Sequence, residues 1–99
     1  MTHVTLNKSN GRYSIEAVGH AKGSVQACAA VSAIMYSVLG YLSNVDGVLI
    51  DCADFTDGFF SICFEGGAEA DVIYDFCTVA FLQLDLSYGE YISVVREEK

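Results

Sequence analysis

The sequence predicts an α+β fold, a two-layer sandwich in which two long helices cover a mainly antiparallel sheet of about five strands. Three observations predict it. Short segments of alternating polarity are separated by tight-turn residues, as in paired strands. Two longer apolar segments carry helical spacing, and the order along the chain is ββαββαβ. The 99 residues are expected to form one domain, 1–99, because so short a chain holds a single core.

Residues 2–6 and 12–18 are predicted to be the first two strands, joined around residues 7–11, where Asn10-Gly11 is a turn signal. Apolar and polar residues alternate along the second segment, so one of its faces is expected to point into the core. Residues 19–23 break this alternation and are expected to form a loop.

The first helix is predicted to begin after Ser24, which suits the N-cap position, and to end near Ser43-Asn44. It is expected to be a buried core helix rather than a membrane span, because serines and a glycine interrupt its apolar run. Residues spaced three and four apart form its predicted core stripe: Cys28, Val31, Met35, Val38 and Leu42.

A third strand is expected to begin at Val48-Leu49-Ile50 and a fourth to cover 59–64, with Asp57-Gly58 as the turn. A second helix is predicted over 68–86 and a final strand over 90–96. This helix is apolar on most sides, so it is expected to contact the sheet and also the first helix or a partner subunit. Its predicted polar stripe consists of Asp71, Asp75, Thr78 and Asp85.

The composition excludes some functional classes. At 53% hydrophobic residues and a mean hydropathy of +0.37, the chain is not a disordered segment. The apolar excess predicts a homodimer. Thirteen acidic against five basic residues give a net charge of −8, which excludes nucleic-acid binding. Such a surface attracts a basic protein or peptide, or simply keeps an apolar fold in solution. With no basic or apolar leader at the N-terminus, we expect a cytoplasmic protein.

Four cysteines are present, and none forms a C-x-x-C pair. With only His3 and His20 beside them, no zinc site is expected, and no metal or cofactor is predicted. In the cytoplasm the thiols are expected to be reduced. Cys52, Cys63 and Cys77 have no neighbouring histidine and are interpreted as packing residues.

One place in the chain indicates chemistry. Cys28 lies in the first turns of the predicted helix, where the dipole and free N–H groups favour a thiolate and can stabilise an oxyanion. His20, in the loop before it, is of the residue type that activates cysteine nucleophiles. Ser32 follows one turn after Cys28 on the same helix face. The alternative reading makes Cys28 a small core residue and His20 an ordinary loop residue.

The blocks Gly19-His20-Ala21 and Cys28-Ala29-Ala30-Val31-Ser32-Ala33, in this order, resemble those of the ribosomal-processing cysteine protease (Prp) family. The resemblance extends along the whole chain. It implies a bacterial, usually dimeric peptidase that trims a short N-terminal extension from a large-subunit ribosomal protein. By motif, Cys28 corresponds to the nucleophile and His20 to the catalytic histidine. Gly19, Ala21 and Ser32 are then expected to belong to the substrate-binding surface.

Two departures from the family pattern are visible. Seven residues (21–27) separate His20 from Cys28, where the family usually has a longer loop, and Val25 stands where an acidic residue is common. These differences leave two other functions open. The same fold could be an inactive dimeric module that binds a basic peptide, or a structural subunit that assembles through its second helix. A third catalytic residue is not identified, although Glu16 is one option.

Overall fold

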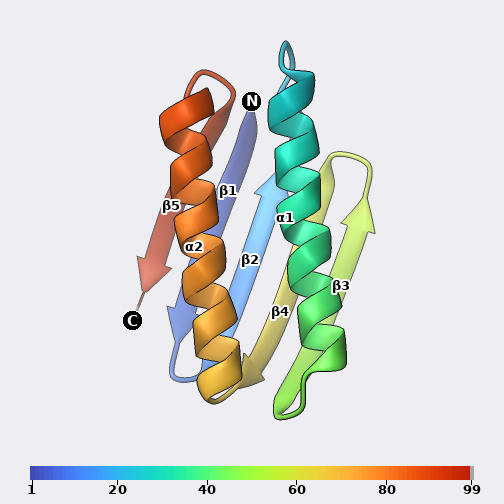
Figure 1. Cartoon of the computed structure of the whole chain (residues 1–99), viewed down its shortest axis with the longest axis vertical. Helices are drawn as coiled ribbons and strands as arrows, with labels where there is room; N and C mark the ends of the chain where they lie inside the picture. The colour runs from blue at the N-terminus through green and yellow to red at the C-terminus, as the bar shows by residue number, and fades with distance from the viewer. Residues whose placement is uncertain (99) are drawn as a thin grey trace.

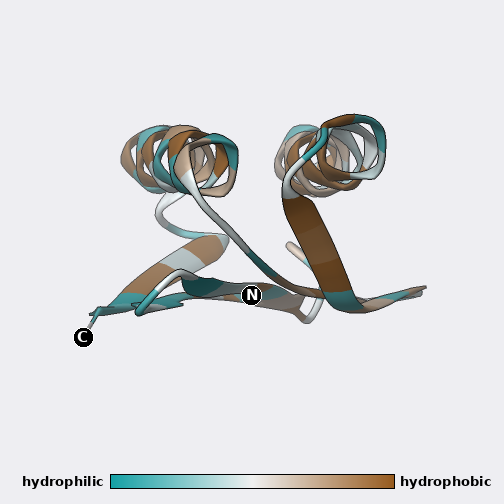
Figure 2. Ribbon diagram, turned by 90° about the horizontal axis from the view of Figure 1, so that it is seen from below, coloured by the Kyte–Doolittle hydropathy of each residue, from teal (hydrophilic) through white to brown (hydrophobic). Residues whose placement is uncertain are grey.

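The computed structural model describes residues 1–98, and it confirms the predicted α+β architecture and the order ββαββαβ. The sheet is built from β1 (Thr2–Ser9), β2 (Arg12–Val18), β3 (Val48–Thr56), β4 (Phe59–Gly66) and β5 (Ile92–Glu98). The helices are α1 (Val25–Asn44) and α2 (Ala68–Tyr88), and both lie on the same face of the sheet (Figures 1 and 2).

The strand order is β3-β4-β2-β1-β5. Three of the four neighbouring pairs are antiparallel, whereas β1 and β5 are parallel. Each helix joins two strands that run in the same direction, β2 to β3 through α1 and β4 to β5 through α2, so each connection crosses over the sheet (Figure 1). The helices therefore form one layer, and within residues 1–98 no second layer covers the opposite face of the sheet (Figure 2).

The core lies between the helices and the sheet. In β1 and β2, residues alternate between this layer and the outer face, which is the pattern predicted for β2. The buried stripe of α1 begins at Ala27 rather than at the predicted Cys28, which is only half-buried. The rest of the stripe is as expected: Val31, Met35, Val38 and Leu42. The small change in phase leaves the Cys28 thiol at the border of the core.

The predicted polar stripe of α2 is wrong for Thr78, whereas Asp75 and Asp85 are exposed as expected and Asp71 is half-buried. Thr78, assigned to the polar stripe, is buried, and its hydroxyl donates a hydrogen bond to the Tyr74 carbonyl at 3.0 Å. The exposed residues of α2 also include apolar ones, among them Val72, Phe76, Val79 and Leu86. Asp71 lies toward the strands, where it pairs with a lysine.

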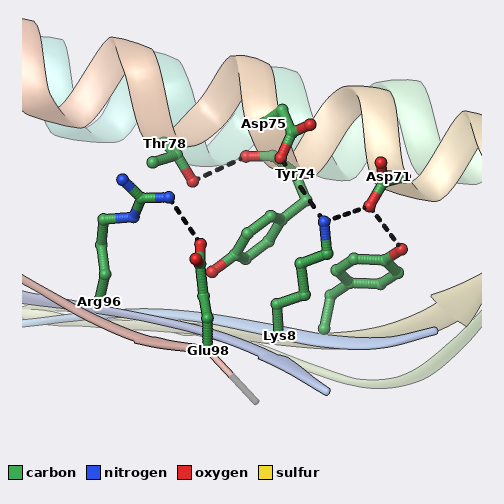
Figure 3. A network of polar contacts seen from close by, with 8 residues as sticks. Lys8, Asp71, Tyr74, Asp75, Thr78, Arg96 and Glu98 are labelled. Atoms are coloured by element: carbon green, nitrogen blue, oxygen red, sulfur yellow. Dashed lines mark hydrogen bonds and ion pairs between the residues drawn. The ribbon is translucent and has the colours of Figure 1, made fainter. Parts of the chain in front are cut away.

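That lysine is Lys8 of β1, whose Nζ lies 2.6 Å from Asp71 Oδ1 and 4.0 Å from Asp75 Oδ1 (Figure 3). The Tyr13 hydroxyl donates a second hydrogen bond to Asp71 at 3.0 Å. The hydrogen bonds from Lys8 and then Tyr13 lower the pKa of Asp71, and the same contact raises the pKa of Lys8. This cluster attaches α2 to β1 and β2 at the end of the sheet opposite the candidate site.

Candidate active site

Three chain segments meet at the end of the sheet where β2 finishes: the loop before α1, the start of β1 and the β3–β4 turn (Figure 1). Thr2 Oγ1 donates to the Gly19 carbonyl at 3.1 Å, and the Gly19 N–H donates to the Gly58 carbonyl at 2.8 Å. Gly19 has φ +95°, and a Cβ there would lie 2.6 Å from the Met1 carbonyl oxygen. Glycine is therefore required where the loop leaves the strand.

A cavity of about 430 Å³ opens between these segments and α1. His20, Cys28, Ser32 and Gly19 all line it, so the fold brings four of the five sequence-predicted site residues to one place. The fifth, Ala21, is not part of this lining. Its side chain is buried, and its carbonyl accepts a contact from Cys28 Sγ at 3.6 Å.

Cys28 takes its position from the start of α1. The N-cap Ser24 is extended, and its Oγ accepts the Ala27 N–H at 3.1 Å, which fixes the first turn. The Cys28 N–H donates to the Ser24 carbonyl at 3.2 Å, so it belongs to the helix ladder. The N–H groups available to an oxyanion are consequently those earlier in the turn, at Val25 and Gln26, rather than that of Cys28.

His20 is half-exposed at the mouth of the cavity, and its Nε2 lies 3.7 Å from Asp57 Oδ1. Gly58 follows directly, and a Cβ on it would lie 2.8 Å from the same Nε2. The sequence identified Asp57-Gly58 only as a turn. Its proximity to His20 depends on the sheet order, so no local signal in the sequence could have shown it.

The far wall of the cavity is aromatic. Tyr36, Phe55 and Phe60 pack edge to face, with ring centroids 5.1 to 5.8 Å apart. All three line the cavity beside Val31. Pockets of this kind bind apolar side chains, while a few polar groups set the orientation of the ligand.

The other three cysteines lie outside this cavity. Cys77 is buried, and burial raises its pKa to about 12. Cys63 is half-buried on β4, and burial, followed by a hydrogen bond with Cys52, raises its pKa to about 11. The prediction that all three are packing residues is wrong for Cys52, which is exposed. A β-bulge between Ile50 and Cys52 shifts the alternation of β3 and turns Cys52 to the outer face, opposite Cys63.

A thiol at a helix start and an imidazole that share one cleft define the class of a small α+β cysteine hydrolase. The comparisons agree with that class. The family model of the cysteine protease Prp matches residues 1–93, so the chain belongs to this family of cysteine peptidases. A comparison with curated proteins finds no match.

The fold is also similar to solved structures of low sequence identity. The ribosomal processing protease Prp from S. aureus, with a covalently linked product peptide, superimposes with a TM-score of 0.80 at 21% identity, covering 100% of both chains. Its complex with a substrate peptide gives 0.79 at 20% identity, covering 98% of this chain and 100% of that one. SMU.848 from Streptococcus mutans gives 0.77 at 18% identity, covering 100% of this chain and 96% of that one.

Proposed function

We propose that this chain is a bacterial cytoplasmic endopeptidase that trims a short N-terminal extension from a large-subunit ribosomal protein. Cys28 is the nucleophile, and His20 is the general base and then the general acid. The observation that carries the proposal is the position of Cys28 in the first turns of α1, in one open cavity with His20. The family and the peptide complexes of the S. aureus protein support the same class of substrate.

In the first half of the reaction, His20 accepts the Cys28 proton and the thiolate attacks the scissile carbonyl carbon. The carbonyl π electrons move to oxygen, and the first-turn N–H groups of α1 stabilise the resulting oxyanion. The oxyanion collapses, the C–N bond breaks, and His20 gives its proton to the leaving amine. The product at this stage is a thioester on Cys28.

In the second half, His20 takes a proton from water while the water oxygen attacks the thioester. Collapse of that intermediate breaks the C–S bond, and the protonated His20 returns its proton to the Cys28 sulfur. The new carboxylic acid loses its proton to water and leaves as a carboxylate. The aromatic wall of Tyr36, Phe55 and Phe60 favours an apolar side chain next to the cleaved bond. The net charge of −8 favours a substrate whose following segment is basic, because it attracts positive charge over the whole surface.

The experiment uses the large-subunit ribosomal protein with its N-terminal extension, cloned from the same genome. Mass spectrometry of the reaction should show one cut near the N-terminus with the wild-type chain and none with Cys28→Ala, which leaves the fold nearly unchanged. Cleavage retained in Cys28→Ala would overturn the assignment. Equally tight binding of the intact substrate by both proteins, without a cut, would favour the inactive binding module.

We further propose that the enzyme is a homodimer and that the exposed apolar side of α2 is its interface. A groove of about 200 Å³ runs between α1 and α2, and Phe76, itself 70% exposed, lies along it. The opposite side of the groove is formed by small residues of α1, Ala33 and Ser37. A projecting phenylalanine beside a shallow apolar groove is self-complementary about a two-fold axis, as an isologous contact between copies requires.

A further inference from the structure

We propose that Asp57 is a positioning residue for His20: its carboxylate holds the proton of the neutral imidazole on Nε2, so that Nδ1 is left free to accept the Cys28 proton. The catalytic consequence rests on the function proposed above, whereas the effect on His20 can be measured without it. Asp57 would thus be the third member of the site, which the sequence left unidentified.

Backbone hydrogen bonding places both partners beside each other. The Gly19 N–H donates to the Gly58 carbonyl at 2.8 Å, so the residue before His20 is bonded to the residue after Asp57. This bond continues the β2–β4 ladder, in which Val18 pairs with Phe59, so the His20 loop and the β3–β4 turn are held side by side.

Asp57 Oδ1 faces Nε2 at 3.7 Å, and Gly58 presents no side chain on the same side of the ring. The distance is longer than a hydrogen bond, so the carboxylate acts on the nearer ring nitrogen through its charge. A carboxylate that faces one ring nitrogen selects the tautomer with the proton on that nitrogen and leaves the other as an acceptor.

Asp57 is the one carboxylate among the described residues that line the cavity, and the other titratable groups there are Cys28, Tyr36 and His20 itself. Glu16, the residue considered from the sequence, pairs with Thr5 and Ser61 across the sheet and is not part of the lining. Val25, at the position where the family often has an acid, carries no charge and is 83% exposed. A carboxylate from another segment thus occupies the role.

The size of the effect follows from exposure. The Asp57 side chain is 97% exposed, so solvent screens it and its influence on His20 is that of a surface ion pair. We expect removal of the carboxylate to slow Cys28 alkylation by about twofold to fivefold. A buried catalytic aspartate would have a far larger effect.

The test records the ¹⁵N chemical shifts of the His20 imidazole at a pH high enough for the ring to be neutral. The proteins are the wild type, Asp57→Asn and Asp57→Ala, with Asp54→Ala as the matched control, since Asp54 is exposed on β3 and does not line the cavity. The Nε2-protonated fraction should fall from wild type to Asp57→Asn to Asp57→Ala and stay unchanged in Asp54→Ala. Asp57→Asn keeps a turn-forming residue and an oxygen acceptor, so its intermediate value guards against a folding effect.

Iodoacetamide alkylation of Cys28 in the same variants is the second readout, in a Cys52→Ser background that removes the exposed thiol. Its rates should follow the same order. Identical ¹⁵N shifts in the wild type and Asp57→Ala, or an equal change in Asp54→Ala, would overturn the positioning role. The tautomer could change in Asp57→Ala while the rate of Cys28 alkylation stays the same even in His20→Ala. In that case the positioning role stands and the peptidase proposal fails.

Discussion

The α-carbon of Gly58 lies against the imidazole of His20, so close that a Cβ at this position would be 2.8 Å from Nε2. Gly58 also has φ +73°, a conformation that is costly for other residues. The β3–β4 turn therefore acts as a backbone wall that sets where the His20 ring can lie. No larger residue fits there without moving the ring.

The first prediction is that Gly58→Ala displaces His20. We expect about 1–2 kcal/mol of lost stability from the positive φ and a fall in kcat/KM of about tenfold to a hundredfold from the displaced base. Gly47→Ala is the matched control, because Gly47 has φ +85° with no backbone atom within 4 Å of its added Cβ, at a turn outside the cavity. It should show the stability loss alone. Equal activity of the two variants would contradict this role of the turn.

The second prediction concerns the four thiols. Cys77 is fully buried, and burial raises its pKa to about 12, so it should resist alkylation until the protein unfolds. Cys77→Ser should cost about 1–3 kcal/mol, because a hydroxyl would be buried in place of the thiol. Cys52→Ser should change stability by less than about 0.5 kcal/mol, since Cys52 is exposed. Mass spectrometry after timed labelling, together with urea unfolding, checks both.

The third prediction is a pH dependence of stability from the pair of Lys8 and Asp71. The hydrogen bond from Lys8 lowers the pKa of Asp71 from 3.8, so its contribution is present above that value and is lost as the pH falls through the lower value of the folded state. The pKa of Lys8 is raised from 10.5, so its contribution is present below 10.5 and is lost as the pH rises through its folded value.

Asp71→Asn should therefore unfold at lower urea than the wild type at pH 7, with a difference that disappears on acidification below the folded-state pKa of Asp71. Because both side chains are partly exposed, the difference should also shrink in high salt. Asp85→Asn, an exposed aspartate near the end of α2, should be neutral or slightly stabilising at pH 7. A difference in unfolding urea concentration between wild type and Asp71→Asn that stays the same at acidic pH would contradict an ionic contribution from this pair.

The fourth prediction tests the interface. Phe76→Asp should raise the dimer dissociation constant by about thirtyfold or more, the size of a central aromatic contact, when measured by sedimentation. Val95→Asp is the matched control, because Val95 is also an exposed apolar residue but lies on β5, away from the helix groove. If Val95→Asp dissociates the dimer and Phe76→Asp does not, the interface lies on the sheet instead.

Much of the fold could be predicted because its signals are local. The Asn10-Gly11 and Asp57-Gly58 turns, the Ser24 N-cap and the core stripe of α1 each depend on residues close together in sequence. The parallel pairing of β5 with β1 was not predicted, since it depends on where the α2 crossover places its last strand. Thr78 was misassigned to the polar stripe of α2 for a similar reason, because its burial depends on how the helix packs on the sheet and not on its neighbours in the sequence.

The same distinction applies to the site. Cys28 and His20 are eight positions apart (28 − 20 = 8) and flank a helix start, so the sequence could single them out as a candidate pair, and the fold places both at one cavity. Asp57, Gly58 and the aromatic wall join them only because β4 pairs with β2 and brings the β3–β4 turn beside the His20 loop. A residue whose role depends on strand order carries no local signal.

The most direct test of the central claim is the rate of Cys28 alkylation by iodoacetamide near pH 6.5, in the Cys52→Ser background with and without His20→Ala. We predict fast labelling of Cys28 when His20 is present. The rate should fall by about tenfold or more when His20 is removed, because a positioned base commonly contributes about a hundredfold or more to rate. Slow labelling at the same rate in both proteins would contradict it, and would make Cys28 a border residue of the core.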